Sequence, residues 1–209
     1  MVQKKIMKKI LHVISSPRGE ASYSIRLGHS IIEKLQEVYP DSIVKENVLV
    51  NKQFPHLEEA QIRSFYTAPE NRTPQNIEAI QHSDEAIHEI MEADILVIGA
   101  PMYNFSVPST LKAWIDHIAR AGVTFKYDDK GPKGLVHGKK VYLAVASGGV
   151  YSQGQMKPYD FVTPYLQTVL GFIGLTDVTV VRAEGTSIPQ IKDKAIETAI
   201  ERLGLLKVA

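Results

Sequence analysis

Short apolar runs alternate with segments of helical periodicity along most of this 209-residue chain. The most apolar run, Ile-Leu-Val-Ile at residues 95–98, is typical of a parallel strand that is covered on both faces. Further strands are expected at residues 9–15, 42–50, 141–146 and 178–181. Helices are expected from Ser22 to the turn at Pro40, at 57–65, at 76–91, after Pro108, at 161–173 and at 190–206. This alternation predicts an α/β fold with a parallel sheet and right-handed crossovers.

Five such strands fit a flavodoxin-like, three-layer α/β fold with a five-stranded parallel sheet in the order 2-1-3-4-5. No internal repeat, low-complexity tract or linker interrupts the pattern, so residues 1–209 are expected to form a single domain. Ligands in such sheets bind beyond the carboxyl ends of the strands, where the strand order reverses. The loops after the first, third and fourth predicted strands therefore form the candidate site.

Composition excludes several functions. The formal net charge of +1 gives no electrostatic footprint for nucleic-acid binding. The chain has no cysteine, which removes disulfides, thiolate metal sites and the nucleophile of the low-molecular-weight tyrosine phosphatases, whose topology can be similar. No stretch approaches the about 20 apolar residues of a membrane span, and the run at residues 10–14 is too short for a signal peptide. We therefore expect a cytoplasmic protein without a membrane partner.

The first candidate loop is rich in hydroxyl groups that lie at or near a predicted helix N-terminus. They belong to Ser15, Ser16, Ser22 and Ser24. Unpaired N–H groups and the helix dipole favour an anion there, and hydroxyls add donors without charge, which suits a phosphate monoester. A serine N-cap with a polar turn is the structural alternative. The spacings G-x-G-x-x-G and G-x-x-x-x-G-K-[ST] are absent, so dinucleotide and P-loop sites are not expected.

The other two candidate loops offer different chemistry. Residues 100–108 carry a tyrosine, an asparagine and a phenylalanine, the combination of aromatic surface and hydrogen-bonding groups that a flat heterocycle such as isoalloxazine needs. Residues 146–151 contain paired glycines, which let the backbone approach a ligand closely. Each loop could also be an ordinary turn, and only their shared position favours the ligand-binding interpretation.

Several motifs give the chain a family resemblance. They are P-M-Y-N-F at 101–105 followed by S-V-P-S-T-L-K-A-W-I-D, A-R-A-G-V-T-F-K-Y at 119–127, G-P-K-G-L at 131–135, V-T-P-Y-L at 162–166 and G-F-I-G at 171–174. With the serine-rich loop they span most of the chain. The sequence resembles the bacterial FMN-dependent NADH-azoreductases, within the flavodoxin-like NAD(P)H:quinone oxidoreductases.

The resemblance implies one FMN per subunit, a homodimer, and active sites built partly from both chains. It implies that the phosphate and ribityl chain are held by Ser16, Ser22, Tyr23 and Ser24. It implies that the rest of the cofactor site is formed by Pro101, Met102, Tyr103, Asn104, Phe105, Ala146, Ser147, Gly148 and Gly149. The substrate face would be lined by Phe125, Tyr127 and Phe172. One departure is the A-S-G-G stretch, where the family has S-R-G-G, so polar contacts near the flavin pyrimidine are expected to differ.

The implied activity is electron transfer from NADH, or NADPH, to quinones and, by reductive cleavage, to aromatic azo compounds, in a ping-pong cycle. The chemistry would be carried by flavin N5, and we assign no catalytic side chain. Two alternatives stay open at this point. One is a flavodoxin-type electron carrier, although such carriers are usually acidic and this chain is not; the other is a module that has lost its cofactor.

The histidines do not predict a metal centre. His12 falls in a predicted strand, and His29, His82, His88 and His117 fall in predicted helices. His82 and His88 are six residues apart, the wrong interval for one face of a helix. We therefore expect no metal site.

Overall fold

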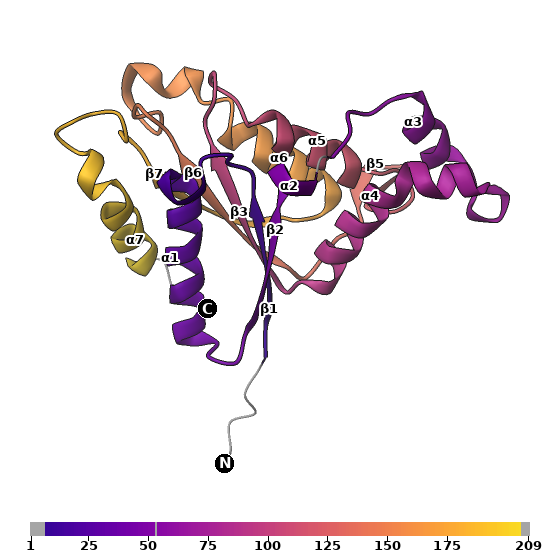
Figure 1. Ribbon diagram of the computed structural model, residues 1–209, viewed down its shortest axis with the longest axis horizontal. Helices are drawn as coiled ribbons and strands as arrows, with labels where there is room; N and C mark the ends of the chain where they lie inside the picture. Colours follow the sequence, from indigo (N-terminus) through magenta and orange to yellow (C-terminus); the bar gives the residue numbers. More distant parts are fainter. Residues whose placement is uncertain (1–6, 53, 206–209) are drawn as a thin grey trace, which may run out of the picture.

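A five-stranded parallel sheet forms the centre of the computed structural model, which describes residues 7–52 and 54–205 (Figure 1). Its strands are β1 (Lys9–Ile14), β2 (Ile43–Val48), β3 (Ile95–Pro101), β6 (Lys140–Ala146) and β7 (Asp177–Ala183). Every pair of neighbouring strands runs parallel. The predicted flavodoxin-like α/β class with five parallel strands is therefore confirmed.

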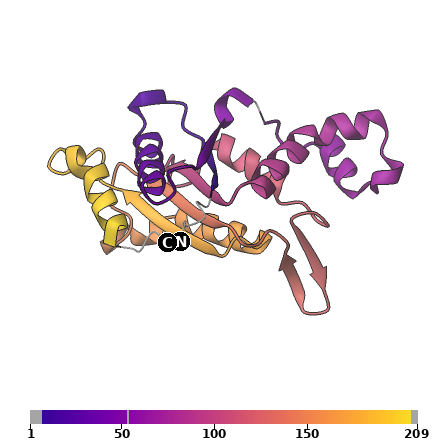
Figure 2. The ribbon, with the colours of Figure 1, turned by 90° about the horizontal axis from the view of Figure 1, so that it is seen from below.

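The predicted strand order needs a correction. The sheet has the order β2-β1-β3-β6-β7, not 2-1-3-4-5, because two unpredicted strands lie between β3 and β6 in the chain. These are β4 (Phe125–Asp128) and β5 (Gly131–Gly134), which pair with each other as an antiparallel hairpin that extends away from the sheet (Figure 2). The sequence of this segment indicates turns rather than strands, because glycine and proline are poor strand formers. Its pairing depends on the tight turn between the two strands.

Two layers of helices cover the sheet (Figure 1). One face carries α1 (Tyr23–Val38) and α7 (Ala195–Leu205), and the other carries α4 (Pro74–Glu92), α5 (Ser109–Ile118) and α6 (Thr163–Ile173). All seven residues of β3 are buried, and the side chains of residues 95–98 alternate between the two hydrophobic cores. Leu96 and Ile98 pack on the side of Trp114, whereas Ile95 and Val97 pack on the side of Leu27. This burial on both faces explains why residues 95–98 form an unbroken apolar run.

The shorter helical elements connect these layers. They are α2 (Leu49–Lys52), α3 (Glu59–Tyr66), and the 3₁₀ turns η1 (Gly19–Ala21), η2 (Pro69–Asn71), η3 (Gly154–Tyr159) and η4 (Lys192–Lys194). The helix expected at 190–206 is divided into η4 and α7, and residue 206 lies outside the described residues. Among the helices that the structure describes, none combines the length and the apolarity that crossing a membrane requires.

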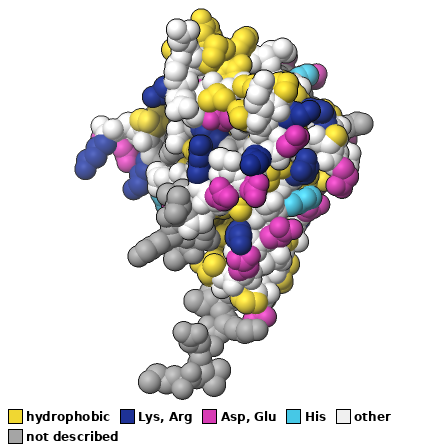
Figure 3. Space-filling view, turned by 90° about the vertical axis from the view of Figure 1, so that its left-hand side faces the viewer, with side chains coloured by type: hydrophobic (Ala, Val, Ile, Leu, Met, Phe, Trp, Pro, Cys, Tyr) yellow, Lys and Arg dark blue, Asp and Glu magenta, His cyan; other side chains and the backbone are white. Residues whose placement is uncertain are grey.

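The surface over α1 and α7 is mixed in charge, with basic and acidic side chains interspersed (Figure 3). Hydrophobic side chains gather instead at the upper end of this view, where the strands end. Large apolar side chains of the loops and turns after β3 and β6 are 41–55% exposed: Phe105, Met156, Tyr159 and Phe161. The carboxyl end of the sheet is therefore the more apolar end of this face.

A glycine contact ties the hairpin to α6 and gives a test of the packing. A Cβ on Gly134 would lie 2.2 Å from the backbone nitrogen of Gly174, which ends α6 with a φ of +106°. We expect Gly134→Ala to lower the free energy of unfolding by about 1–3 kcal/mol, because backbone atoms must move apart. The matched control is Gly171→Ala within α6, where a Cβ meets nothing within 4 Å. It should be neutral or stabilising by up to about 1 kcal/mol, since alanine favours a helix. Urea unfolding of both variants measures the difference, and equal effects would show that the close approach is absent in solution.

Candidate active site

Four loops at the carboxyl ends of β1, β3, β6 and β7 surround a cavity of about 240 Å³. Nine residues that the sequence analysis placed in the cofactor site line it: Ser22, Tyr23, Ser24, Pro101, Met102, Tyr103, Ala146, Ser147 and Gly148. Four others are not among its lining residues: Ser16, Asn104, Phe105 and Gly149. The cavity thus brings together all three loops that the sequence analysis selected, together with a fourth after β7.

The N-terminus of α1 opens onto this cavity. Ser22 caps the helix, with its Oγ accepting a 3.5 Å hydrogen bond from the N–H of Ile25, and the Oγ atoms of Ser22 and Ser24 lie 3.1 Å apart. The first N–H groups of a helix have no intrahelical acceptor, and the dipole of a 16-residue helix adds partial positive charge there. Arg18 is the one charged residue among those that line the cavity. This end of the cavity is suited to an anion.

Ser15 and Ser16 shape the first loop and do not line the cavity. The Ser15 hydroxyl donates to the carbonyl of Gly99 at 2.6 Å, and the Thr110 hydroxyl donates to the carbonyl of Ser15 at 3.1 Å. The Ser16 hydroxyl accepts from the N–H of Arg18 at 3.3 Å. The hydrogen bonds of Ser15 therefore fit the turn interpretation, while Ser22 both caps the helix and lines the cavity. That Ser16 holds the cofactor stays a prediction.

The second loop contains a tight, strained turn. Tyr103 and Ser106 exchange two backbone hydrogen bonds of 2.9 and 3.0 Å around Asn104 and Phe105, whose φ values are +50° and +69°. Asparagine tolerates this left-handed region, whereas for phenylalanine it costs about 1–3 kcal/mol. Such strain is concentrated at functional sites in proteins.

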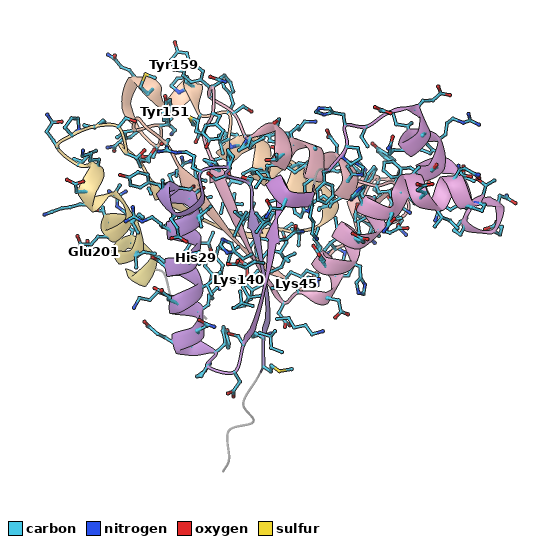
Figure 4. The ribbon with its side chains drawn as sticks, viewed as in Figure 1. His29, Lys45, Lys140, Tyr151, Tyr159 and Glu201 are labelled. Atoms are coloured by element: carbon cyan, nitrogen blue, oxygen red, sulfur yellow. The ribbon has the colours of Figure 1, made fainter. Side chains whose placement is uncertain are left out.

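The strained turn keeps the aromatic side chain of Phe105 partly exposed on the surface. The Phe105 ring is 45% exposed, with its centroid 6.3 Å from that of Tyr151 and 6.0 Å from that of Tyr159. Figure 4 shows Tyr151 and Tyr159 together at the end of the molecule where the strands of the sheet finish. The turn thus builds an exposed aromatic cluster beside the cavity.

The loops after β6 and β7 hold each other in place. The N–H groups of Gly185, Thr186 and Ser187 donate to the carbonyls of Gly149, Ser147 and Gly148 respectively, at 3.0–3.1 Å. A Cβ on Gly148 would lie 2.8 Å from the Ser187 Oγ. A larger residue at position 148 would therefore have to displace the Ser187 side chain, which belongs to the other loop that lines the cavity.

The aromatic residues expected at the substrate face form a separate group. The ring centroids of Phe125 and Phe172 are 4.4 Å apart, and those of Phe125 and Tyr127 are 5.8 Å apart. Tyr127 is 70% exposed, while the other two are half-buried. The hairpin and α6 thus bring the three together, although none of them lines the cavity of the same chain.

Three lining residues were missed by the sequence analysis: Arg18, Thr186 and Ser187. Arg18 lies in the first candidate loop. It is the one cationic side chain among residues 15–24, and a cation beside a helix N-terminus indicates an anion site. Thr186 and Ser187 follow the last strand of the sheet. The rule that ligands bind beyond the carboxyl ends of strands could have found them, had it been applied to that strand as well.

One buried ion pair fixes the start of α6, the helix that carries Phe172. The Asp160 carboxylate accepts from the N–H groups of Val162 and Thr163 and lies 2.7 Å from the guanidinium of Arg182. Burial alone would raise the pKa of Asp160, but the Thr163 N–H and the Arg182 cation outweigh it and hold this pKa below its usual value. The native state therefore favours the ionised carboxylate.

Comparisons with known proteins agree with this geometry. A family model of the flavodoxin-like fold matches residues 8–205. An FMN-dependent NADH:quinone oxidoreductase from Herminiimonas arsenicoxydans is 50% identical over 182 residues, which cover 87% of this chain and 89% of the relative. A protein of the same description from Rhizobium etli is 43% identical over 97% of this chain and 100% of its own length. The crystal structure of an azoreductase from Bacillus anthracis matches with a TM-score of 0.87 and 30% identity, covering 96% of this chain and 98% of that one.

The ion pair at Asp160 predicts a pH-dependent contribution to stability. Because its pKa is depressed in the folded state, the carboxylate stabilises the fold above the ordinary aspartate range of about 4, and this contribution is lost as pH falls through the lower native value. We expect Asp160→Asn to cost about 1–3 kcal/mol at pH 7. The gap to the unmodified protein should shrink below about pH 4. Urea unfolding across this pH range measures it, and a gap that is constant with pH would contradict the assignment.

Proposed function

We infer that this chain, which belongs to the flavodoxin-like family, is an FMN-dependent enzyme that passes electrons from NADH to quinones and, by reductive cleavage, to aromatic azo compounds. One observation carries the inference. A single cavity at the carboxyl end of the sheet combines a helix N-terminus, hydroxyl groups and one arginine with an aromatic loop. The relatives named FMN-dependent NADH:quinone oxidoreductase, at up to 50% identity, support the same activity.

The residues present fit FMN. The helix N-terminus with Ser22, Ser24 and Arg18 would hold the dianionic phosphate, because backbone N–H groups, hydroxyls and a guanidinium all donate hydrogen bonds to phosphate oxygens. The apolar ring system would lie toward Met102 and Tyr103 and the backbone of the loop after β6. When bound there, FMN would take up two electrons from NADH and deliver them to the oxidant.

The protein's own contribution is then binding, orientation and exclusion of water. The mutual hydrogen bonds of the loops after β6 and β7 hold the backbone atoms that would face the ring system. A preformed site of this kind loses little entropy on binding. We assign no side chain as an acid or base. Because the A-S-G-G stretch lacks the arginine of the family, only uncharged groups of that loop would contact the pyrimidine end of the flavin.

We propose that the active enzyme is a homodimer. The three residues expected at the substrate face, Phe125, Tyr127 and Phe172, do not line the cavity of their own chain, and Tyr127 is largely exposed. Exposed apolar side chains also gather at the end of the molecule that contains the cavity, including Tyr159 and Phe161. In a dimer these surfaces would be buried, and the aromatic group of one chain could cover the substrate position of the other.

Other features belong to the same proposal. The whole chain, residues 1–209, acts as a single FMN-binding domain, and it works in the cytoplasm. NADH is the donor that the names of the relatives support, and NADPH is a further candidate. The flavodoxin-type carrier has no observation in its favour.

The phosphate contacts can be tested with two flavins that differ only in that group. We expect the unmodified protein to bind FMN more tightly than riboflavin, and Arg18→Gln to weaken FMN binding by roughly tenfold, since a charge-assisted hydrogen bond is lost. Riboflavin binding should change less than about twofold. Quenching of flavin fluorescence measures both affinities.

The control is Arg63→Gln, which removes an exposed arginine from α3, away from the residues that line the cavity. It should leave both affinities unchanged. Equal weakening of FMN and riboflavin by Arg18→Gln would show that the phosphate lies elsewhere. A protein that binds neither flavin would contradict the proposed function itself.

A further inference from the structure

A cluster of three potential metal ligands lies away from the cavity, between α1 and the edge of the sheet. His12 comes from β1, Glu46 from β2 and His29 from α1, and His12 and Glu46 are direct partners in the register of the two strands. Glu46 Oε1 lies 3.5 Å from His12 Nδ1 and 3.1 Å from His29 Nε2. One ligand atom from each residue can be chosen so that all three lie within 4.8 Å of one another.

His12 is an unusual residue to find at this place. Its side chain is fully buried, and neither ring nitrogen has a hydrogen-bond partner among the described residues. A buried polar group without a partner costs about 1–3 kcal/mol. The ring also depends on Gly28 of α1, because a Cβ there would lie 2.4 Å from His12 Nε2. The fold therefore makes room for an imidazole whose Nδ1 faces Glu46 and whose ring lies edge-on to that of His29, with the two centroids 5.2 Å apart.

The other two ligands leave the cluster open on one side. The side chains of His29 and Glu46 are 45% and 49% exposed, and β2 is an edge strand of the sheet. Figure 4 labels His29 on α1, and its 3.1 Å contact with Glu46 places the ring between α1 and β2. A hydrated ion can therefore enter from solvent and keep a water ligand on the exposed side.

The donor set and its spacing suit zinc. In a tetrahedral site with bonds of about 2.0–2.2 Å, ligand atoms lie about 3.3–3.5 Å from one another. The 3.5 Å distance from Glu46 Oε1 to His12 Nδ1 matches this spacing, and the 3.1 Å distance to His29 Nε2 is slightly shorter. The two imidazole nitrogens lie within 4.8 Å of each other, so a bound ion would draw them together.

We propose that His12, His29 and Glu46 form a site for a divalent transition-metal ion of the zinc type, with water as the fourth ligand. This differs from the expectation from sequence, which compared histidines along single helices, whereas these ligands come from three elements that only the fold brings together. The site would join edge strand β2 to β1 and α1. It does not depend on the proposed function.

The test is zinc binding by tag-free protein with its flavin retained, after removal of metals with a chelator. Isothermal titration with Zn²⁺ alone should show one ion per chain. His29→Ala and Glu46→Gln alter half-exposed side chains and leave the buried His12 in place. Each should weaken zinc binding at least tenfold, because removal of even an outer-shell partner of a ligand typically costs about 10–100-fold in metal affinity. His137→Ala removes an exposed histidine outside the cluster and should change the affinity by less than about twofold.

Zinc X-ray absorption supplies a second readout that does not depend on activity. The unmodified protein should show a shell of nitrogen and oxygen ligands with two imidazoles, and His29→Ala should show one. The proposal is overturned if the chain binds no zinc, or if the two cluster variants bind it as tightly as His137→Ala does.

Discussion

Parallel pairing of the central strands is the constraint on which the candidate site depends. The register joins Ile14 to Gly99, Pro101 to Ala146, and Ala146 to Ala183, so β1, β3, β6 and β7 finish close to one edge of the sheet. Each following loop starts at that edge, whatever its sequence. Serines near position 22, aromatic residues near 103 and glycines near 148 are far apart in the chain, and this pairing alone brings them around one cavity. The buried β3 makes the pairing possible, because its apolar side chains fill the cores on both faces of the sheet.

Local backbone features, a set of hydrogen bonds between two loops and a left-handed turn, then determine the shape of the site at that edge. The loops after β6 and β7 share three backbone hydrogen bonds beside Gly148, and the left-handed turn at Asn104 and Phe105 holds an aromatic ring outward. The hydrogen bonds between the loops restrain the backbone around the cavity. The left-handed turn costs stability and places the exposed Phe105 ring beside Tyr151 and Tyr159. The rest of the fold, with its continuous cores, supplies the stability that offsets this strain. A site built in this way is held in place before any ligand arrives, which is the condition for tight binding of a rigid heterocycle.

The sequence predicted those parts of the structure that follow from local pattern and from the rule for α/β sheets. The apolar run at residues 95–98 identified β3, and the positions of three loops identified most of the cavity. Features that depend on pairing or on distant contacts were missed. The sequence of the β4–β5 hairpin shows no strand pattern. Gly131 and Pro132 belong to a strand only because they pair with Asp128 and Tyr127 across the hairpin. Ser15 resembles a ligand-binding serine in the sequence, and only its hydrogen bond to the carbonyl of Gly99 shows that it joins the first loop to β3. His12, His29 and Glu46 likewise carry no motif, since a strand register and a helix face bring them together.

The most direct test of the account is an anaerobic spectroscopic titration of the purified protein reconstituted with FMN. Addition of NADH should bleach the flavin absorption near about 450 nm, a property of the cofactor, with one NADH consumed per chain. Subsequent addition of a quinone should restore the absorption, with one hydroquinone formed per chain. This result would establish both halves of electron transfer at a single site. A flavin band that NADH leaves unchanged, or one that the quinone fails to restore after bleaching, would contradict the proposed NADH:quinone oxidoreductase activity.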